Sequence, residues 1–84
     1  MDMFSKIVHE FELEDERSVV EFMRSVIEAR TYQIAKALHM SVDDVYWTCD
    51  RLLRKNQLKA DLKIGITLNE AQVLQYCQVW HYKP

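Results

Sequence analysis

The apolar residues of the first thirty positions recur at helical spacing. In residues 3–12 they are Met3, Phe4, Ile7, Val8 and Phe11, and from Arg17 to Arg30 they are Val19, Phe22, Met23, Val26 and Ile27. Each stripe predicts an amphipathic helix, and Asp15 suits the cap of the second one. One bent helix over residues 1–30 is an alternative, because no Gly or Pro interrupts them. Residues Ile7 to Leu13 also alternate, so a strand is the alternative to a helix in this first segment.

Residues 31–55 predict two short helices joined by a tight corner. Thr31 suits the N-cap of a helix over Tyr32–His39, and Met40 fills the corner. Ser41 then opens a third helix over Val42–Lys55, through a capping box in which Asp44 replaces the usual Glu. The expected inward residues are Ile34, Ala35, Leu38, Val45, Cys49, Leu52 and Leu53. The opposite side of the third helix presents Asp43, Tyr46, Trp47, Asp50, Arg51 and Arg54.

After Asn56 the period changes from helical to alternating. Leu58, Ala60, Leu62 and Ile64 alternate with Lys59, Asp61 and Lys63, and Gly65 follows. This predicts a half-exposed strand that ends in a turn. The tail has two interpretations: the capping-box sequence Thr67–Glu70 favours a short helix from Leu68 followed by an extended end, whereas the β-prone run Val79–Tyr82 can return beside the first strand.

Composition limits the chain to one small and mainly helical domain. Of its 84 residues one is Gly and one is Pro, so little of it is available for loops. The longest apolar runs are a few residues, too short for a membrane span. Cys49 and Cys77 follow no signal sequence, so we expect a cytoplasmic protein with reduced thiols and no membrane partner.

The net charge of −2 hides an uneven distribution. Residues 1–29 carry eight acidic and three basic side chains, whereas residues 30–63 carry four acidic and seven basic ones. A basic middle segment is typical of a nucleic-acid face, although solvated helix surfaces account for it equally well. We interpret the acidic run Glu10–Glu16 as a solvated junction between helices.

The order of helix, helix, third helix and basic strand resembles a winged helix-turn-helix domain. The resemblance covers residues 17–64. Thr31–Leu38 is similar to the family's T-x-x-I-A-x-x-L segment. Met40–Leu58 is similar to its L-S-x-x-x-V-x-x-x-L-x-x-L-x-x-x-G-x-I segment, with Asn56 at the position where the family often has Gly. Among small members, the chain is most similar to bacterial and phage regulators of the fimbrial-operon (FaeA-like) type. The expected fold is mainly α with a small β-hairpin, in a single domain: an N-terminal extension over 1–16, a three-helix core over 17–56, and a wing and tail over 57–84.

The resemblance implies a small transcription regulator that reads duplex DNA with the helix at 42–55 and a basic wing strand. In the major groove, Asp43, Tyr46, Trp47 and Arg51 would face base edges. The expected phosphate contacts are Arg54, Lys55, Lys59 and Lys63, with Thr31 and Lys36 on the supporting helix.

The acidic residues of the same helix support a different use of the fold. Three carboxylates oppose a polyanion unless a cation engages them, and Asp50 is placed to hold Arg54 one turn later. If exposed, Tyr46 and Trp47 are typical anchors of a protein interface; alternatively one of the two, with Trp47 an equal candidate, packs under the wing as core. A protein-contact module of phage or plasmid origin is therefore the alternative function, and a second copy of the chain is a further candidate partner.

Metal binding and catalysis have little support in the sequence. Cys77 and His81 are four residues apart, but no Cys-x-x-Cys pair accompanies them. The chain also has no Gly-rich phosphate loop and no nucleophile motif. We therefore expect no enzyme activity, no metal and no cofactor.

Overall fold

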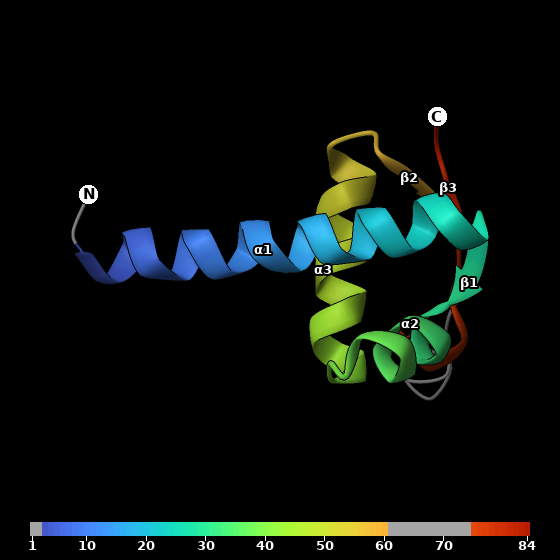
Figure 1. Ribbon diagram of the computed structural model, residues 1–84, viewed down its shortest axis with the longest axis horizontal. Helices are drawn as coiled ribbons and strands as arrows, with labels where there is room; N and C mark the ends of the chain where they lie inside the picture. Colours follow the sequence, from blue (N-terminus) through green and yellow to red (C-terminus); the bar gives the residue numbers. More distant parts are fainter. Residues whose placement is uncertain (1–2, 61–74) are drawn as a thin grey trace, which may run out of the picture.

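The computed structural model describes the backbone of residues 3–60 and 75–84, and the side chains of residues 11–60 and 75–84. Within these described residues the main elements are three helices and three strands (Figure 1). They are α1 (Met3–Val26), β1 (Glu28–Arg30), α2 (Thr31–Leu38), α3 (Val42–Arg54), β2 (Leu58–Ala60) and β3 (Val79–Tyr82).

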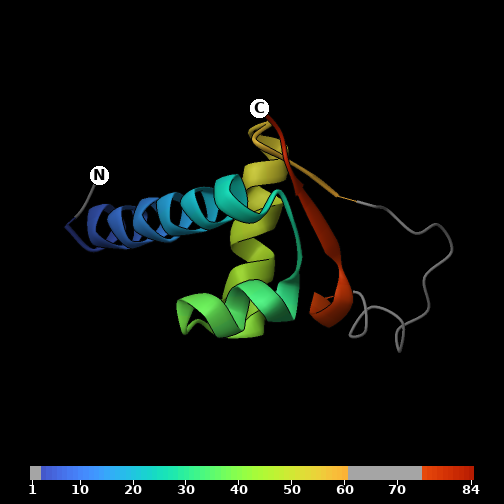
Figure 2. The ribbon, with the colours of Figure 1, turned by 45° about the vertical axis from the view of Figure 1, so that its right-hand side comes forward.

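Residues 3–26 form one long helix rather than two. α1 runs without a break for 24 residues, so the predicted cap at Asp15 is wrong. Its C-terminal half lies on the body of the molecule and is crossed by α3, whereas its N-terminal half extends beyond the other elements (Figures 1 and 2). The helix also ends earlier than predicted, because Ile27 adopts a left-handed conformation with φ 70° and residues 28–30 continue as a strand.

The corner between α2 and α3 lies close to where the sequence placed it. The N-cap of α2 is Arg30 rather than Thr31, and Arg30 N donates a hydrogen bond to Gln33 Oε1 at 2.8 Å. His39 ends α2 in the left-handed region at φ 56°. Ser41 caps α3 as predicted, since its Oγ accepts a hydrogen bond from Asp44 N at 3.1 Å. Asn56 follows α3 at φ 64°, a conformation that Asn tolerates better than most residues and that explains why it can replace Gly.

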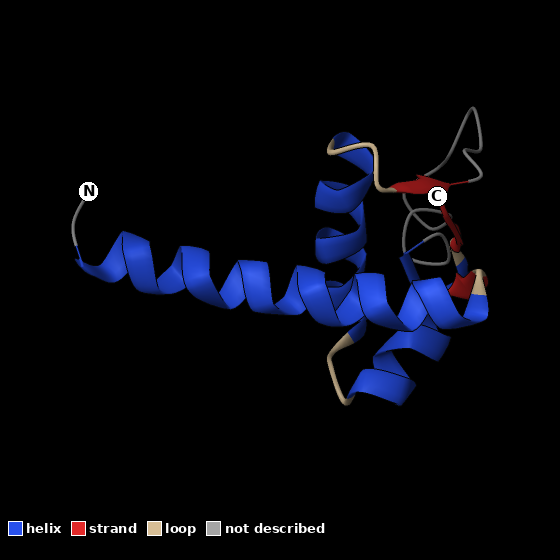
Figure 3. Cartoon of the chain, turned by 45° about the horizontal axis from the view of Figure 1, so that its top comes forward, coloured by secondary structure: helices blue, strands red, loops and turns tan. Residues whose placement is uncertain are grey.

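The strands form a three-stranded antiparallel sheet in the order β1-β3-β2 (Figure 3). The last strand is therefore central: Trp80 pairs with Ala29 on one side and with Ala60 on the other. The predicted extended end and its return beside the first predicted strand are confirmed. The remaining strand of the sheet, β1, was not predicted. The expected helix start at Leu68 and the position of Lys63 lie outside the described residues, although residues 75–77 are helical.

The core fills the space between the three helices and the inner face of the sheet. Its fully buried members include Val19, Met23, Ile34, Val45, Cys49, Leu52, Leu58 and Trp80. Val26 and Ile27 were predicted to join them but are 42% and 56% exposed, because α1 ends there and the chain turns away. The arrangement is a winged helix-turn-helix fold, mainly helical with a small sheet.

Candidate nucleic-acid interface

Three of the four residues on the outward side of α3 are exposed, and the fourth, Asp50, is partly buried. Asp43, Trp47, Asp50 and Arg54, spaced four, three and four residues apart, lie on one face of the helix and are here called the α3 ridge. Trp47 is 51% exposed, and Asp43 and Arg54 are exposed as well. The opposite face buries Val45, Thr48, Cys49 and Leu52. The alternative that one of the two aromatics packs as core is therefore wrong for Trp47, whereas Tyr46 is partly buried against the core. The outward side of α3 is available to a partner.

Three aromatic rings connect the α3 ridge to the core. The half-buried Tyr46 makes edge-on contacts with Trp47, at a centroid distance of 5.6 Å, and with the buried Trp80, at 5.7 Å. Burial raises the pKa of the Tyr46 hydroxyl, and the nearby Asp50 carboxylate raises it further, so the phenol stays neutral. Since β3 supplies Trp80, the central strand holds Tyr46, and Tyr46 in turn packs against the exposed indole of Trp47.

Thr31 is buried and cannot contact DNA with its side chain. Its Oγ1 accepts a hydrogen bond from Trp80 Nε1 at 2.9 Å and donates one to Gln78 O at 3.4 Å, and the residue is 0% exposed. The prediction that Thr31 supports phosphate binding is therefore wrong. The Thr31 hydroxyl instead accepts the hydrogen bond of the buried Trp80 N–H, because a buried tryptophan N–H needs an acceptor.

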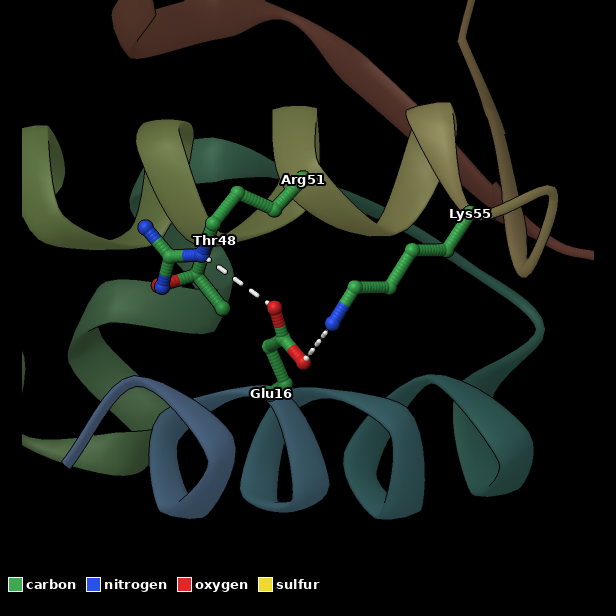
Figure 4. Close-up of polar contacts among 4 residues, drawn as sticks. All are labelled: Glu16, Thr48, Arg51 and Lys55. Atoms are coloured by element: carbon green, nitrogen blue, oxygen red, sulfur yellow. Dashed lines mark hydrogen bonds and ion pairs between the residues drawn. The ribbon is translucent and has the colours of Figure 1, made fainter. Parts of the chain in front are cut away.

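Two predicted DNA contacts, Arg51 on α3 and Lys55 at its C-cap, point toward α1 and share one carboxylate (Figure 4). Arg51 Nε lies 3.2 Å from Glu16 Oε1, and Lys55 Nζ lies 2.7 Å from Glu16 Oε2. Arg51 also donates a hydrogen bond to Thr48 Oγ1 at 3.1 Å. The Glu16 side chain is only 9% exposed. The interpretation of Glu10–Glu16 as a solvated junction is thus wrong for Glu16, which pairs with residues 35 and 39 positions later.

A second ion pair lies on the α3 ridge itself. Arg54 Nη2 is 3.0 Å from Asp50 Oδ2 across one helical turn, as the spacing predicted. The Arg54 side chain is 76% exposed and the Asp50 side chain 24%. Arg54 is therefore accessible to a phosphate, but a carboxylate stands beside it.

Acidic side chains of α1 and α3 influence one another where α1 approaches the first turn of α3. Burial raises the pKa of Asp15, and the neighbouring carboxylates of Asp44 and Glu14 raise it further, against the opposing charge of Arg51. Asp43 and Asp44 also lie in the first turn of α3, where the helix dipole favours negative charge. The N-terminal end of α3 is consequently acidic.

The remaining predicted contacts lie away from the α3 ridge. Lys36 is exposed on α2. Lys59 is exposed on β2 and pairs in register with His81, which pairs in turn with Glu28. Since Leu58 and Trp80 of the same strands are buried, this row lies on the sheet face that points away from the core. His81 Nδ1 is 3.7 Å from Glu28 Oε1.

The described part of the chain offers little support for metal binding, a membrane span or a reactive thiol. Among these residues, no group of three or more His, Cys, Asp or Glu side chains could hold a metal ion, and no helix is long and apolar enough to cross a membrane. Burial raises the pKa of the Cys49 thiol to about 12, which makes it inert at neutral pH.

The fold has a counterpart among known structures. No protein-family model matches the sequence, and no curated protein matches it. The chain is similar to the crystal structure of the Zalpha domain from Carassius auratus PKZ in complex with Z-DNA, with a TM-score of 0.66 and 21% sequence identity over 86% of this chain and 97% of that chain. At this identity the likeness shows the winged-helix fold alone. The narrower resemblance to FaeA-like regulators finds no support.

Proposed function

We propose that this chain is a non-catalytic winged-helix domain that binds duplex DNA through the α3 ridge and regulates transcription. The observation that carries the proposal is the uncovered ridge, on which Trp47 is 51% exposed while the opposite face of α3 is buried. Winged helices read duplexes with this helix. The similar Zalpha domain was crystallised with Z-DNA, which supports a nucleic acid as the ligand of the fold.

Within this proposal the residues of the α3 ridge divide into two roles. Asp43 and Trp47 face base edges, where a carboxylate can accept from cytosine and an indole can pack on apolar base surface. Arg54 meets a phosphate, and the exposed Lys36 and Lys59 add positive charge at the borders of the interface. Lys63 belongs to the same predicted set of phosphate contacts.

The charges around α3 predict a shallow dependence of affinity on salt. Arg51, Arg54 and Lys55 are each paired with a carboxylate, so few cations are free to replace the counterions of DNA. The slope of log affinity against log salt falls by about 0.9 for each phosphate neutralised. We expect a slope that corresponds to about two to three phosphates.

The test is fluorescence anisotropy with labelled duplexes of mixed sequence and with an alternating dC-dG duplex held in the left-handed form. Trp47→Ala should weaken binding by about tenfold or more, as loss of a central aromatic anchor does. Arg54→Ala should weaken it by about threefold through one lost phosphate contact. The matched controls are Phe11→Ala and Arg24→Ala, exposed residues of α1. Absence of binding to every duplex at low salt would overturn the proposal.

A protein-contact module is the second candidate, and one observation favours it. Asp43 and Asp50 flank the half-exposed Trp47 on the α3 ridge, and an aromatic anchor among carboxylates suits a basic protein surface better than a polyanion. This candidate predicts no duplex binding at low salt. A second copy of the chain as the partner predicts a dimer in light scattering that Trp47→Ala dissociates.

A further inference from the structure

The Glu16 carboxylate uses both of its oxygens on cations of the recognition helix. Oε1 lies 3.2 Å from Arg51 Nε and Oε2 lies 2.7 Å from Lys55 Nζ. Glu16 comes from α1, and its side chain is 9% exposed, whereas the side chains of Arg51 and Lys55 are 30% and 46% exposed. The carboxylate is therefore screened from water while its two partners still reach the surface. Figure 4 shows the two cations converging on the Glu16 carboxylate.

Arg51 and Lys55 are one helical turn apart, on the flank of α3 between the ridge and α1. Cations at such positions ordinarily meet the phosphates beside the groove. A phosphate that approaches here has to compete with a carboxylate already in contact. Charge-assisted hydrogen bonds of this kind, made in a partly desolvated site, are stronger than exposed ion pairs.

We propose that Glu16 acts as an internal counter-ion that withholds Arg51 and Lys55 from the DNA backbone and so makes binding depend on the α3 ridge. Glu16 is in this sense a positioning residue that sets the affinity and its salt dependence without contacting the ligand. The inference rests on the proposed function. Its consequence is a lower affinity for every duplex, with a larger share of the remaining affinity supplied by base contacts, which alone carry sequence information.

The decisive variant is Glu16→Gln, which keeps the shape of the side chain and removes its charge. The matched control is Glu21→Gln, which removes the same charge from an exposed position of the same helix. The affinity of each protein for a preferred duplex and for a scrambled duplex is measured over a salt series. We expect Glu16→Gln to bind both duplexes about three- to tenfold more tightly at low salt, with a salt slope steeper by about one to two. The ratio of the two affinities should change little, because phosphate contacts strengthen binding to both sequences alike.

The cations provide a converse test that does not depend on the stability of the Glu16 variant. In the wild-type background, Lys55→Gln should change affinity less than twofold or so, because its partner Glu16 is only 9% exposed and keeps the pair closed. Arg54→Gln should weaken binding about threefold, because the Arg54 side chain is 76% exposed and its pair with Asp50 is open to competition from a phosphate. In the Glu16→Gln background, Lys55→Gln should weaken binding about threefold as well. This coupling is a double-mutant cycle that separates withheld charge from a merely structural contact.

The outcomes separate this inference from the proposed function. If wild type binds duplex and Glu16→Gln has the same affinity and slope as Glu21→Gln, the counter-ion role is overturned and the proposed function stands. If no variant binds any duplex at low salt, the proposed function fails. If Glu16→Gln binds where wild type binds no duplex, the counter-ion role is supported, whereas duplex binding as the function of the wild-type chain fails. Should Glu16→Gln not fold by circular dichroism, equal effects of Lys55→Gln and Arg54→Gln in the wild-type background would overturn the inference.

Discussion

At the scale of single residues, one hydroxyl group joins the start of α2 to the central strand. Thr31 Oγ1 accepts from Trp80 Nε1 and donates to Gln78 O, and the Thr31 amide also donates to Gln78 O at 3.0 Å. Trp80 is 2% exposed, so its indole N–H has no access to water. A buried tryptophan with this hydrogen bond fixes the position against which Tyr46 packs.

We therefore expect Thr31→Val to lower the free energy of unfolding by about 1–3 kcal/mol, because it leaves a buried donor without a partner. Thr48→Val is the matched control, since Thr48 is also buried but its partner Arg51 reaches solvent. The control should lose less than about 1 kcal/mol. Urea denaturation followed by tryptophan fluorescence measures both; equal losses would contradict the account of Trp80.

At the scale of elements, the end of α1 and its contact with α3 decide how the helices are placed. Ile27 is a β-branched residue with φ 70°, a conformation that crowds its side chain. Ile27 N donates to Met23 O at 2.7 Å, and Ile27 O accepts from Tyr82 N at 2.7 Å. The residue thus ends α1 and ties it to β3 at the position where Gly is usual.

Ile27→Gly should raise the free energy of unfolding by up to about 1 kcal/mol, because Gly adopts a positive φ without steric cost and the Ile27 side chain is largely exposed. Arg24→Gly tests the opposite case on the same helix, in its regular part, and should lower stability by about 1 kcal/mol. Thermal unfolding followed by circular dichroism measures both. A loss of stability in Ile27→Gly would show that the side chain makes a contact that outweighs the strain.

Asp15 is expected to oppose folding near neutral pH, because the folded state raises its pKa, mainly through burial and then through Asp44. When folding raises the pKa of a carboxyl group, the protein keeps its full stability at pH values below the unfolded pKa of about 3.9. It loses stability as the pH rises through the pKa of the folded state, because the folded state then has to accommodate the charge. Asp15→Asn should therefore stabilise the protein at pH 7, and the gain should shrink toward pH 3.

The charge-matched comparison for Asp15→Asn is Glu21→Gln, since Glu21 is exposed on the same helix. Urea midpoints of both variants and of wild type are measured at several pH values between 3 and 8. A gain for Asp15→Asn that stays constant with pH, or that Glu21→Gln reproduces, would contradict the assignment of the effect to Asp15.

At the scale of the whole molecule, the last strand holds the two halves of the chain together. β3 pairs with β1, which precedes the helix-turn-helix, and with β2, which follows it. It also supplies Trp80 to the core. The sheet therefore joins residues near position 28 to residues near positions 58 and 80.

Deletion of residues 79–84 should abolish cooperative unfolding, because both edge strands lose their partner and the core loses Trp80. Loss of a buried tryptophan alone costs about 3–5 kcal/mol, a large part of what a domain of this size has. Deletion of the exposed Pro84 alone is the control and should leave the melting curve unchanged. A cooperative melt in the longer deletion would contradict the central role of β3.

By itself, the sequence determined the features that depend on spacing within one element. The helical period placed Val45, Cys49 and Leu52 on the inward side of α3 and Asp43 and Arg54 on the outward side, and the positions of Ser41 and Asp50 predicted a cap and an ion pair within the helix. These follow from the backbone period and from contacts three or four residues apart. The winged-helix fold followed from the order of such elements.

Only the tertiary structure decided which side chains from distant positions meet. Glu16 pairs with residues 35 and 39 positions away and Thr31 with a residue 49 positions away, so neither contact leaves a local pattern in the sequence. β1 was missed for the same reason, because three residues become a strand only when β3 lies beside them. The exposure of Trp47 was likewise settled by whether another element covered it. Local spacing sets the face of a helix, but the packing of the whole chain decides what that face meets.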